Sequence, residues 1–178
     1  MPRNWDQHFA DPANIESAAN PLLIQAADML APGVALDLAC GAGRHALCLA
    51  RLGWRVTAVD ASAVAIAALR AQAGNLPIDA RLANLERGEF LLPPDTYRLL
   101  CDFYYLQRNL FPQIRSSVHP GGLFVGAIHL FDETRNPDFL LQPGELRAFF
   151  DGWKVLFYSE AGEPGRLRKA ARIIARRA

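Results

Sequence analysis

The chain has 178 residues, of which 51% are hydrophobic and 21% are charged, and its net charge is +1. This length and composition predict one compact domain over residues 1–178, with residues 1–20 as an N-terminal arm. A charge this close to neutral predicts neither a nucleic-acid nor an anionic-membrane partner. The three cysteines lack the pair spacing of a metal site, so we expect no bound metal and a reducing compartment. With no apolar signal-peptide core at the start and no membrane-length apolar run, we expect a soluble, cytoplasmic protein.

The first half of the chain reads as strands and helices in alternation. Asn20-Pro21 predicts a helix start, because asparagine can cap and proline fits the first helical turn. Ser62 predicts another helix start, and Gly53 closes the helix before it. The elements expected here are helices at 21–30, 44–52 and 62–74 and strands at 34–38, 54–59 and 78–82.

The second half continues the alternation and then changes it. We expect strands at 97–101 and 123–129, a helix from about Leu110 that residues 119–122 (HPGG) stop, and a helix from Pro143 to about Asp151. Strands at 153–160 and 167–176 end the chain, and a short turn between them requires an antiparallel pair. The fold class predicted is α/β, a Rossmann-like three-layer sandwich with a seven-stranded, mostly parallel sheet and an antiparallel C-terminal hairpin strand.

The segment from Val34 to Ala46 (VALDLACGAGRHA) carries the clearest chemical signal. It reads as a buried strand, a glycine turn and the first turn of a helix. Gly41 and Gly43 allow the backbone to turn sharply and to lie against a ligand. The helix that follows offers free N–H groups and the positive end of its dipole. Open α/β sheets hold nucleotide-like cofactors in this way.

Polar side chains stand at the ends of the next strands, where ligands of such sheets bind. The carboxylate of Asp60 can accept hydrogen bonds from two ribose hydroxyls. The side chain of Asn84 can pair with an exocyclic amine such as that of adenine. The sequence therefore favours a ligand that carries adenosine.

Two cofactors fit this pattern. Gly41-x-Gly43-x-x-Ala46 satisfies the loose dinucleotide fingerprint, which keeps a nicotinamide cofactor open. Asp37 favours the other cofactor, because a carboxylate is unfavourable beside a pyrophosphate but can receive a cationic amino group. The chain also lacks a second mononucleotide-binding half. S-adenosylmethionine therefore fits better than NAD.

At this point several segments resemble the class I S-adenosylmethionine-dependent methyltransferases. Asp37–Arg44 is similar to their motif I, Val56–Asp60 to motif II, and Ala83–Glu86 to the segment that contacts adenine. Within this class, four further segments resemble the small tellurite-resistance and thiopurine-type branch. These are Trp5–Phe9, Asn20-Pro21, Tyr105–Pro112 and Leu141–Leu146.

The resemblance implies methyl transfer from the sulfonium to a small-molecule nucleophile by in-line displacement, with proximity and orientation as the main source of rate. It implies a cofactor site made of Asp37, Ala39, Cys40, Gly41, Gly43, Asp60, Ala61, Asn84, Leu85, Cys101 and Asp102. It also implies that residues 1–20 are a lid over the cofactor. Two alternatives stay open, a protein that binds the cofactor without turnover and an NAD-binding oxidoreductase.

Ala39 and Asn84 depart from the motifs, which more often have glycine and aspartate there. Residues 15–20 also lack the tyrosine or glycine expected in a covering arm.

Aromatic and basic residues after the strand at 97–101 are the candidates for the methyl acceptor. Tyr104 and Tyr105 can shape an acceptor pocket or belong to the core. Arg108 can hold an anionic group or pair with a nearby acid. His129 can act as a general base or be a partly exposed histidine satisfied by water. His45 is expected to point to solvent.

Overall fold

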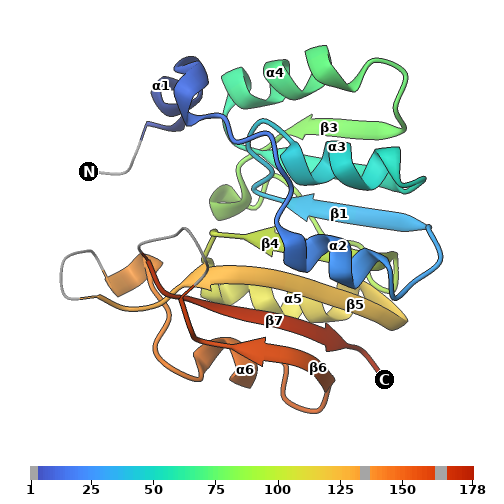
Figure 1. The fold of residues 1–178 in the computed structure, drawn as a ribbon, viewed down its shortest axis with the longest axis vertical. Helices are drawn as coiled ribbons and strands as arrows, with labels where there is room; N and C mark the ends of the chain where they lie inside the picture. Colours follow the sequence, from blue (N-terminus) through green and yellow to red (C-terminus); the bar gives the residue numbers. More distant parts are fainter. Residues whose placement is uncertain (1–3, 133–136, 163–167) are drawn as a thin grey trace. The chain divides into compact units, whose positions relative to one another are not determined.

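The computed structural model describes residues 4–132, 137–162 and 168–178. Its seven strands form one mixed sheet in the order β3-β2-β1-β4-β5-β7-β6 (Figure 1). By internal contacts the chain divides into two compact units, Met1–Leu91 and Leu92–Ala178. Each unit is described by itself below.

The first unit alternates helices with parallel strands. Strand β2 pairs with β1 on one side and with β3 on the other, both in parallel. The strands are β1 (Val34–Leu38), β2 (Arg55–Asp60) and β3 (Ile78–Leu82), and the helices are α1 (Trp5–Ala10), α2 (Pro21–Ala27), α3 (Arg44–Arg51) and α4 (Ala63–Ala73), with 3₁₀ turns η1 (Pro12–Asn14) and η2 (Leu85–Arg87).

The helix starts expected from the sequence are confirmed by their caps. The Oδ1 atom of Asn20 accepts from the N–H of Leu22 at 3.0 Å, at the start of α2. The hydroxyl oxygen of Ser62 accepts from the N–H of Ala65 at 3.1 Å, at the start of α4. The short helix α1 lies in a segment where the sequence predicted only a polar arm.

The second unit contains the strand reversal that the sequence predicted. Strand β5 pairs in parallel with β4, whereas β7 is antiparallel to both β5 and β6. The strands are β4 (Tyr97–Phe103), β5 (Val118–His129), β6 (Lys154–Ser159) and β7 (Ala170–Arg176), and the helices are α5 (Phe111–Ser117) and α6 (Glu145–Ala148), with 3₁₀ turns η3 (Arg108–Leu110) and η4 (Pro137–Phe139). The predicted start of the last strand at Leu167, and most of the turn before it, lie outside the described residues.

The helix expected from about Leu110 ends at Ser117, just before residues 119–122, but the expected strand start at Leu123 is wrong, because β5 begins at Val118 and includes these residues. Gly121 has φ +78°, and a Cβ on Gly122 would lie 2.8 Å from the carbonyl oxygen of Arg98. These glycines therefore let the strand bend against β4, whose register shifts between Tyr97 and Leu99. Strand β4 also runs two residues further than predicted, to Phe103.

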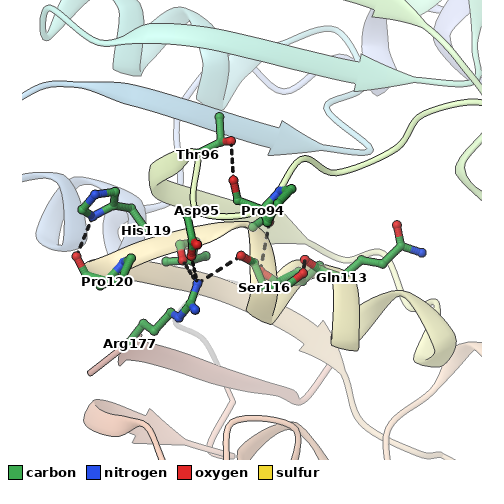
Figure 2. A network of polar contacts seen from close by, with 11 residues as sticks. Pro94, Asp95, Thr96, Gln113, Ser116, His119, Pro120 and Arg177 are labelled. Carbon is green, nitrogen blue, oxygen red and sulfur yellow. Dashed lines mark hydrogen bonds and ion pairs between the residues drawn. The ribbon is translucent and has the colours of Figure 1, made fainter.

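The end of the chain is tied into the second unit by Arg177 (Figure 2). Its Nη1 atom donates to Oδ1 of Asp95 at 2.6 Å, to the carbonyl oxygen of Ser116 at 3.0 Å and to that of Val118. The N–H of Asp95 also donates to the carbonyl oxygen of Ser116, at 2.9 Å. One guanidinium thus joins the C-terminal segment to the turn before β4 and to the junction of α5 with β5.

Candidate cofactor site in the first unit

The loop between β1 and α3 has a backbone that glycine suits best. The φ angles of Ala39, Gly41 and Gly43 are +49°, +54° and +84°. A Cβ on Gly43 would lie 2.2 Å from Cδ1 of Leu69 in α4, so a side chain there would collide with the neighbouring helix. Gly43 is also the N-cap residue of α3 and supplies no side-chain cap. The loop predicted from the sequence therefore has the sharp turns required to bring backbone N–H groups to a ligand.

Asp60 at the end of β2 holds this loop in place. One carboxylate oxygen accepts from the N–H of Gly41 and the other from the N–H of Ser62, both at 2.8 Å. Burial raises the pKa of Asp60, although hydrogen bonds from Ser62, Gly41 and Ala61 oppose the rise. Each carboxylate oxygen can accept more than one hydrogen bond. The geometry thus leaves Asp60 with acceptor capacity for a ligand hydroxyl.

Asp37 lies in the last part of β1 and is almost fully buried. Its Oδ2 atom accepts from the N–H of Ala46 at 3.0 Å, in the first turn of α3. The carboxylate therefore satisfies one of the free N–H groups at that helix start. Burial, together with the charges of Asp37 and Asp60, raises the pKa of the Cys40 thiol well above the ordinary value.

Asn84, predicted to meet adenine, caps the 3₁₀ turn that follows β3. Its Oδ1 atom accepts from the N–H of Arg87 at 3.2 Å, and its own N–H donates to Glu89 at 2.8 Å. Leu85 is buried, and Ala61, which precedes the N-cap residue of α4, is exposed. The amide oxygen of Asn84 therefore has a structural partner within its own turn.

Helix α1 covers the glycine loop of the first unit. A Cβ on Gly41 would lie 2.8 Å from Cζ of Phe9, so the ring rests on the backbone of this glycine. Oδ1 of Asp6 accepts from the hydroxyl of Ser62 at 2.6 Å and from the N–H of Val64 at 3.3 Å. These hydrogen bonds lower the pKa of Asp6, and the hydrogen bond from Ser62 has the largest effect. Asp6 and Phe9 are candidate site residues that sequence reasoning missed, although both lie in the segment that carried the branch resemblance.

The second part of the arm is also attached to the loop. Arg44, the first residue of α3, forms an ion pair with Glu16 and donates to the carbonyl oxygen of Ala18 at 3.4 Å. The segment from 15 to 20 therefore lies against the start of α3 without the tyrosine or glycine that the resemblance led us to expect. His45, expected to point to solvent, is instead buried in α3.

Candidate acceptor residues in the second unit

Two of the predicted cofactor residues belong to β4. Cys101 and Asp102 are both buried. The sequence had placed Asp102 after the strand, whereas in the structure it lies inside β4. The Oδ1 atom of Asp102 accepts from the N–H of Tyr105 at 3.3 Å, which closes the turn after β4. The Tyr105 hydroxyl donates to Gln107 at 2.6 Å. Asp102 and Tyr105 therefore both form hydrogen bonds within the turn that follows β4.

Arg108 pairs with an acid, which is one of the two interpretations left open above. Its Nε and Nη2 atoms donate to the two carboxylate oxygens of Glu145 at 2.6 and 3.1 Å. It also donates to the carbonyl oxygens of Asp138 and Leu140, each at 2.9 Å. The Glu145 hydrogen bond raises the pKa of Arg108 despite some burial. Four hydrogen bonds commit this guanidinium to joining η3, η4 and α6.

Tyr104 and His129 stack on each other at the ends of β4 and β5. Their ring centroids are 4.8 Å apart and their planes differ by 24°. Tyr104 has φ +70°, and its N–H donates to the carbonyl oxygen of Ala127 at 2.7 Å. The sequence named both residues as acceptor candidates but carried no signal of this contact, because the stack depends on the pairing of β4 with β5.

The strand order, the single antiparallel strand and the glycine turn after β1 define a class of protein, the α/β proteins with the Rossmann-like methyltransferase fold. Comparison with known families is more specific. The family described as "Tellurite resistance protein TehB" matches residues 4–176. The chain belongs to this family.

Individual relatives are distant and longer. Hemagglutinin 1 of Eikenella corrodens is 31% identical over 147 residues, which are 77% of this chain and 49% of that protein. A probable S-adenosyl-L-methionine-dependent methyltransferase TehB of Haemophilus influenzae (strain 10810) is 28% identical over 166 residues, 87% of this chain and 57% of that protein. The chain therefore spans about half the length of these curated relatives.

Among solved structures, the crystal structure of TehB from Haemophilus influenzae superposes with a TM-score of 0.80 at 22% identity. The match covers 98% of this chain and 67% of that one, and it supports the fold assignment. Among the described residues, no helix is both long and apolar enough to cross a membrane.

Proposed function

We propose that this chain is an S-adenosylmethionine-dependent methyltransferase that acts on a small-molecule nucleophile. The observation that carries the proposal is the double attachment of Asp60, which receives N–H groups from the glycine loop and from the start of α4. This arrangement keeps a buried carboxylate beside a left-handed glycine backbone, as a ribose-binding site requires. The methyltransferase names of the TehB relatives support the same activity.

The residues present fit this cofactor. Asp60 would accept from the ribose hydroxyls, because its carboxylate is held rigidly and has lone pairs beyond those used by the backbone. Asp37 would attract the methionine amino group, directly or through water, from its buried position in β1. Asn84 and Leu85 would flank the adenine, and Ala61 would lie beside the ribose.

The bound cofactor would supply an electrophilic methyl group and a good leaving group. What the protein adds is orientation, exclusion of water and electrostatic attraction. Helix α1 would contribute to the exclusion of water, since Phe9 already covers Gly41. For the second unit, the roles of Cys101, Asp102, Tyr105 and Arg108 toward the cofactor or acceptor remain predictions. The partner proposed is a small molecule rather than a nucleic acid.

Isothermal titration calorimetry with S-adenosylmethionine, S-adenosylhomocysteine and NAD tests the proposal. We expect binding of the first two and no heat with NAD. Replacing Asp60 with alanine should weaken S-adenosylhomocysteine binding by about 1–3 kcal/mol, because charge-assisted hydrogen bonds are lost. If the alanine variant does not fold, Asp60→Asn replaces it in the test, because asparagine keeps the shape of the side chain. Asp79→Ala, in β3 with an exposed side chain paired to Arg81, is the matched control.

Heat with NAD alone, or equal affinity in the wild type and both Asp60 variants, would contradict this assignment. A protein that binds S-adenosylhomocysteine tightly but methylates no thiol, selenium, tellurium or carboxylate compound would instead be the binding protein without turnover.

A further inference from the structure

Ser62 donates hydrogen bonds to two carboxylates of the first unit. Its hydroxyl donates to Oδ1 of Asp6 at 2.6 Å, and its N–H donates to Oδ1 of Asp60 at 2.8 Å. The residue is almost fully buried, and its hydroxyl oxygen also accepts from the N–H of Ala65 as the cap of α4. A serine hydroxyl has one hydrogen to donate, so the whole donor capacity of this side chain is used on Asp6.

Helix α1 and Asp60 are attached to the same two residues. Helix α1 contacts Ser62 through Asp6 and Gly41 through the ring of Phe9. Asp60 accepts from the N–H groups of Ser62 and Gly41, both at 2.8 Å. Since α1 has six residues and no buried side chain, contacts of this kind fix its position. A movement of Ser62 or Gly41 therefore affects the helix and the carboxylate together.

The charges of the two carboxylates also act on each other. Burial is the main reason why the pKa of Asp60 is raised, and the negative charge of Asp6 adds to the rise. The Cys40 thiol, whose pKa burial raises well above the ordinary value, stays protonated and adds no charge. Like charges repel, and hydroxyl groups that donate to Asp60 stabilise its charged form. Such donors therefore reduce the electrostatic cost of holding Asp6 nearby.

We infer that Ser62 is a positioning residue that couples the docking of α1 to ligand binding at Asp60. The inference rests on the proposed function, in which Asp60 accepts from the ribose hydroxyls. With α1 docked, Ser62 is held by Asp6 and presents a fixed N–H to Asp60, so the carboxylate is oriented for the ligand. By thermodynamic reciprocity, the factor by which docking strengthens binding equals the factor by which binding stabilises docking.

The first test follows Trp5 of α1 by ¹⁹F NMR in protein labelled with 5-fluorotryptophan and needs no ligand. Ser62→Gly removes the hydroxyl but keeps the N–H that Asp60 accepts, and glycine is tolerated at an N-cap. We expect the undocked population of α1 to rise by roughly tenfold. Ser62→Thr should restore the wild-type signal. Ala63→Gly, which weakens the first turn of α4 and leaves the hydroxyl in place, is the control. The wild-type Trp5 signal in Ser62→Gly would overturn the inference.

The second test measures the pKa of Asp60 from the ¹³C NMR signals of the side-chain carboxyl groups across pH, with Asp60→Asn to assign its signal. Asp6→Ala should lower this pKa, because a nearby negative charge and the cover of α1 are both removed. Asp28→Ala removes one negative charge at the C-cap of α2 and should leave the pKa of Asp60 unchanged. The same Asp60 pKa in Asp6→Ala and the wild type would show that the two carboxylates are not linked.

The third test measures the affinity for S-adenosylhomocysteine by calorimetry in a double-mutant cycle. Ser62→Gly and Asp6→Ala should each weaken binding by roughly fivefold. The double variant should bind as weakly as Asp6→Ala alone, because both substitutions remove the same link. Ser62→Thr and Ala63→Gly should bind as the wild type does. Losses that multiply in the double variant, or wild-type affinity in Ser62→Gly, would contradict the coupling.

The wild-type affinity separates the two proposals. A wild type that does not bind S-adenosylhomocysteine would defeat the proposed function, and with it the coupling to this ligand. A wild type that binds it no more tightly than a folded Ser62→Gly variant would defeat only the inference made here.

Discussion

At the scale of single residues, two short side chains govern the glycine loop. Asp60 holds Gly41 by a hydrogen bond, and Ala39 takes a left-handed φ that glycine would adopt with less strain. Ala39 is also where the chain departs from the usual motif. The motif was therefore recognisable from the sequence, but the strain at Ala39 depends on a φ angle that only the folded loop defines.

Replacing Ala39 with glycine should raise the free energy of unfolding by about 1 kcal/mol, because the left-handed region disfavours a Cβ. Ala42→Gly is the control, since Ala42 has no positive φ and glycine there should lower stability by about 0.5–1 kcal/mol. Urea denaturation with unchanged m-values measures both changes. A loss of stability in Ala39→Gly would show that the loop is not strained at this position.

At the scale of elements, side-chain contacts attach short segments to larger ones. Helix α1 has only six residues and no buried side chain, so it depends on Asp6 and Phe9 for its position. Helix α6 has four residues and is joined to η3 by Glu145 and Arg108. Helices this short are not stable by themselves, and their tertiary contacts supply the stabilisation.

Asp6→Ala should release α1, because the Ser62 hydroxyl and the Val64 N–H lose their shared acceptor. We expect the undocked population of α1 to rise by roughly tenfold. ¹⁹F NMR of protein labelled with 5-fluorotryptophan can measure this through Trp5, with the buried Trp54 as an internal reference. Asp28→Ala, at the C-cap of α2, is the charge-matched control and should leave the Trp5 signal unchanged. The same Trp5 signal in Asp6→Ala and the wild type would disprove the attachment.

The Arg108–Glu145 pair should make the stability of the second unit depend on pH. Burial alone would raise the pKa of Glu145, but hydrogen bonds from Arg108 and the Gln142 N–H and the charge of Arg108 hold it below the ordinary value. Because the folded pKa is lowered, the stabilisation is present above about pH 4.3, the unfolded value, and is lost as pH falls through the folded pKa.

Glu145→Gln should therefore lower the free energy of unfolding by about 1 kcal/mol at pH 7, a value kept small because both side chains are partly exposed. The difference from the wild type should vanish toward pH 3. Both proteins are compared by urea denaturation at each pH. The difference between them cancels the contributions of other acids to the pH dependence, such as that of Asp60, whose pKa is raised. A difference that persists unchanged at pH 3 would contradict the pairing.

At the scale of the whole molecule, the chain divides into two units, each with candidate residues of its own. The first unit holds Asp37, Asp60 and Asn84, and the second holds Tyr104 and His129. Contacts such as those of Arg177 stabilise one unit from within. A substitution in one unit can therefore be used to ask whether ligand binding by the other depends on it.

Arg177→Ala should lower the free energy of unfolding by about 1–3 kcal/mol, because Asp95 and two carbonyl groups lose their donor. S-adenosylhomocysteine should still bind with an affinity close to that of the wild type, since its proposed ligands in the first unit are untouched. Thermal denaturation and calorimetry on the same samples measure the two effects. Lys154→Ala, an exposed residue of β6, is the control. A stable variant with weakened binding would contradict both parts of the expectation.

The sequence by itself determined the order of elements, the reversal of the last strand pair and the cofactor motif. These features depend on local signals, such as the caps at Asn20 and Ser62, the glycines after β1 and the short connection between β6 and β7. The errors made in predicting local structure from the sequence also have physical causes. Residues 119–122 have the composition of a turn, but they lie inside β5, where Gly121 and Gly122 form backbone hydrogen bonds with Arg177.

Only the tertiary structure decided which partners the functional side chains have. Asp6 with Ser62, Phe9 with Gly41, Arg108 with Glu145 and Tyr104 with His129 are all contacts between residues more than 20 positions apart. Such contacts follow from strand pairing and helix packing, which bring together residues that no local pattern relates. The sequence could therefore name Arg108 and His129 as candidates, whereas the fold committed the first to an ion pair and placed the second beneath an aromatic ring.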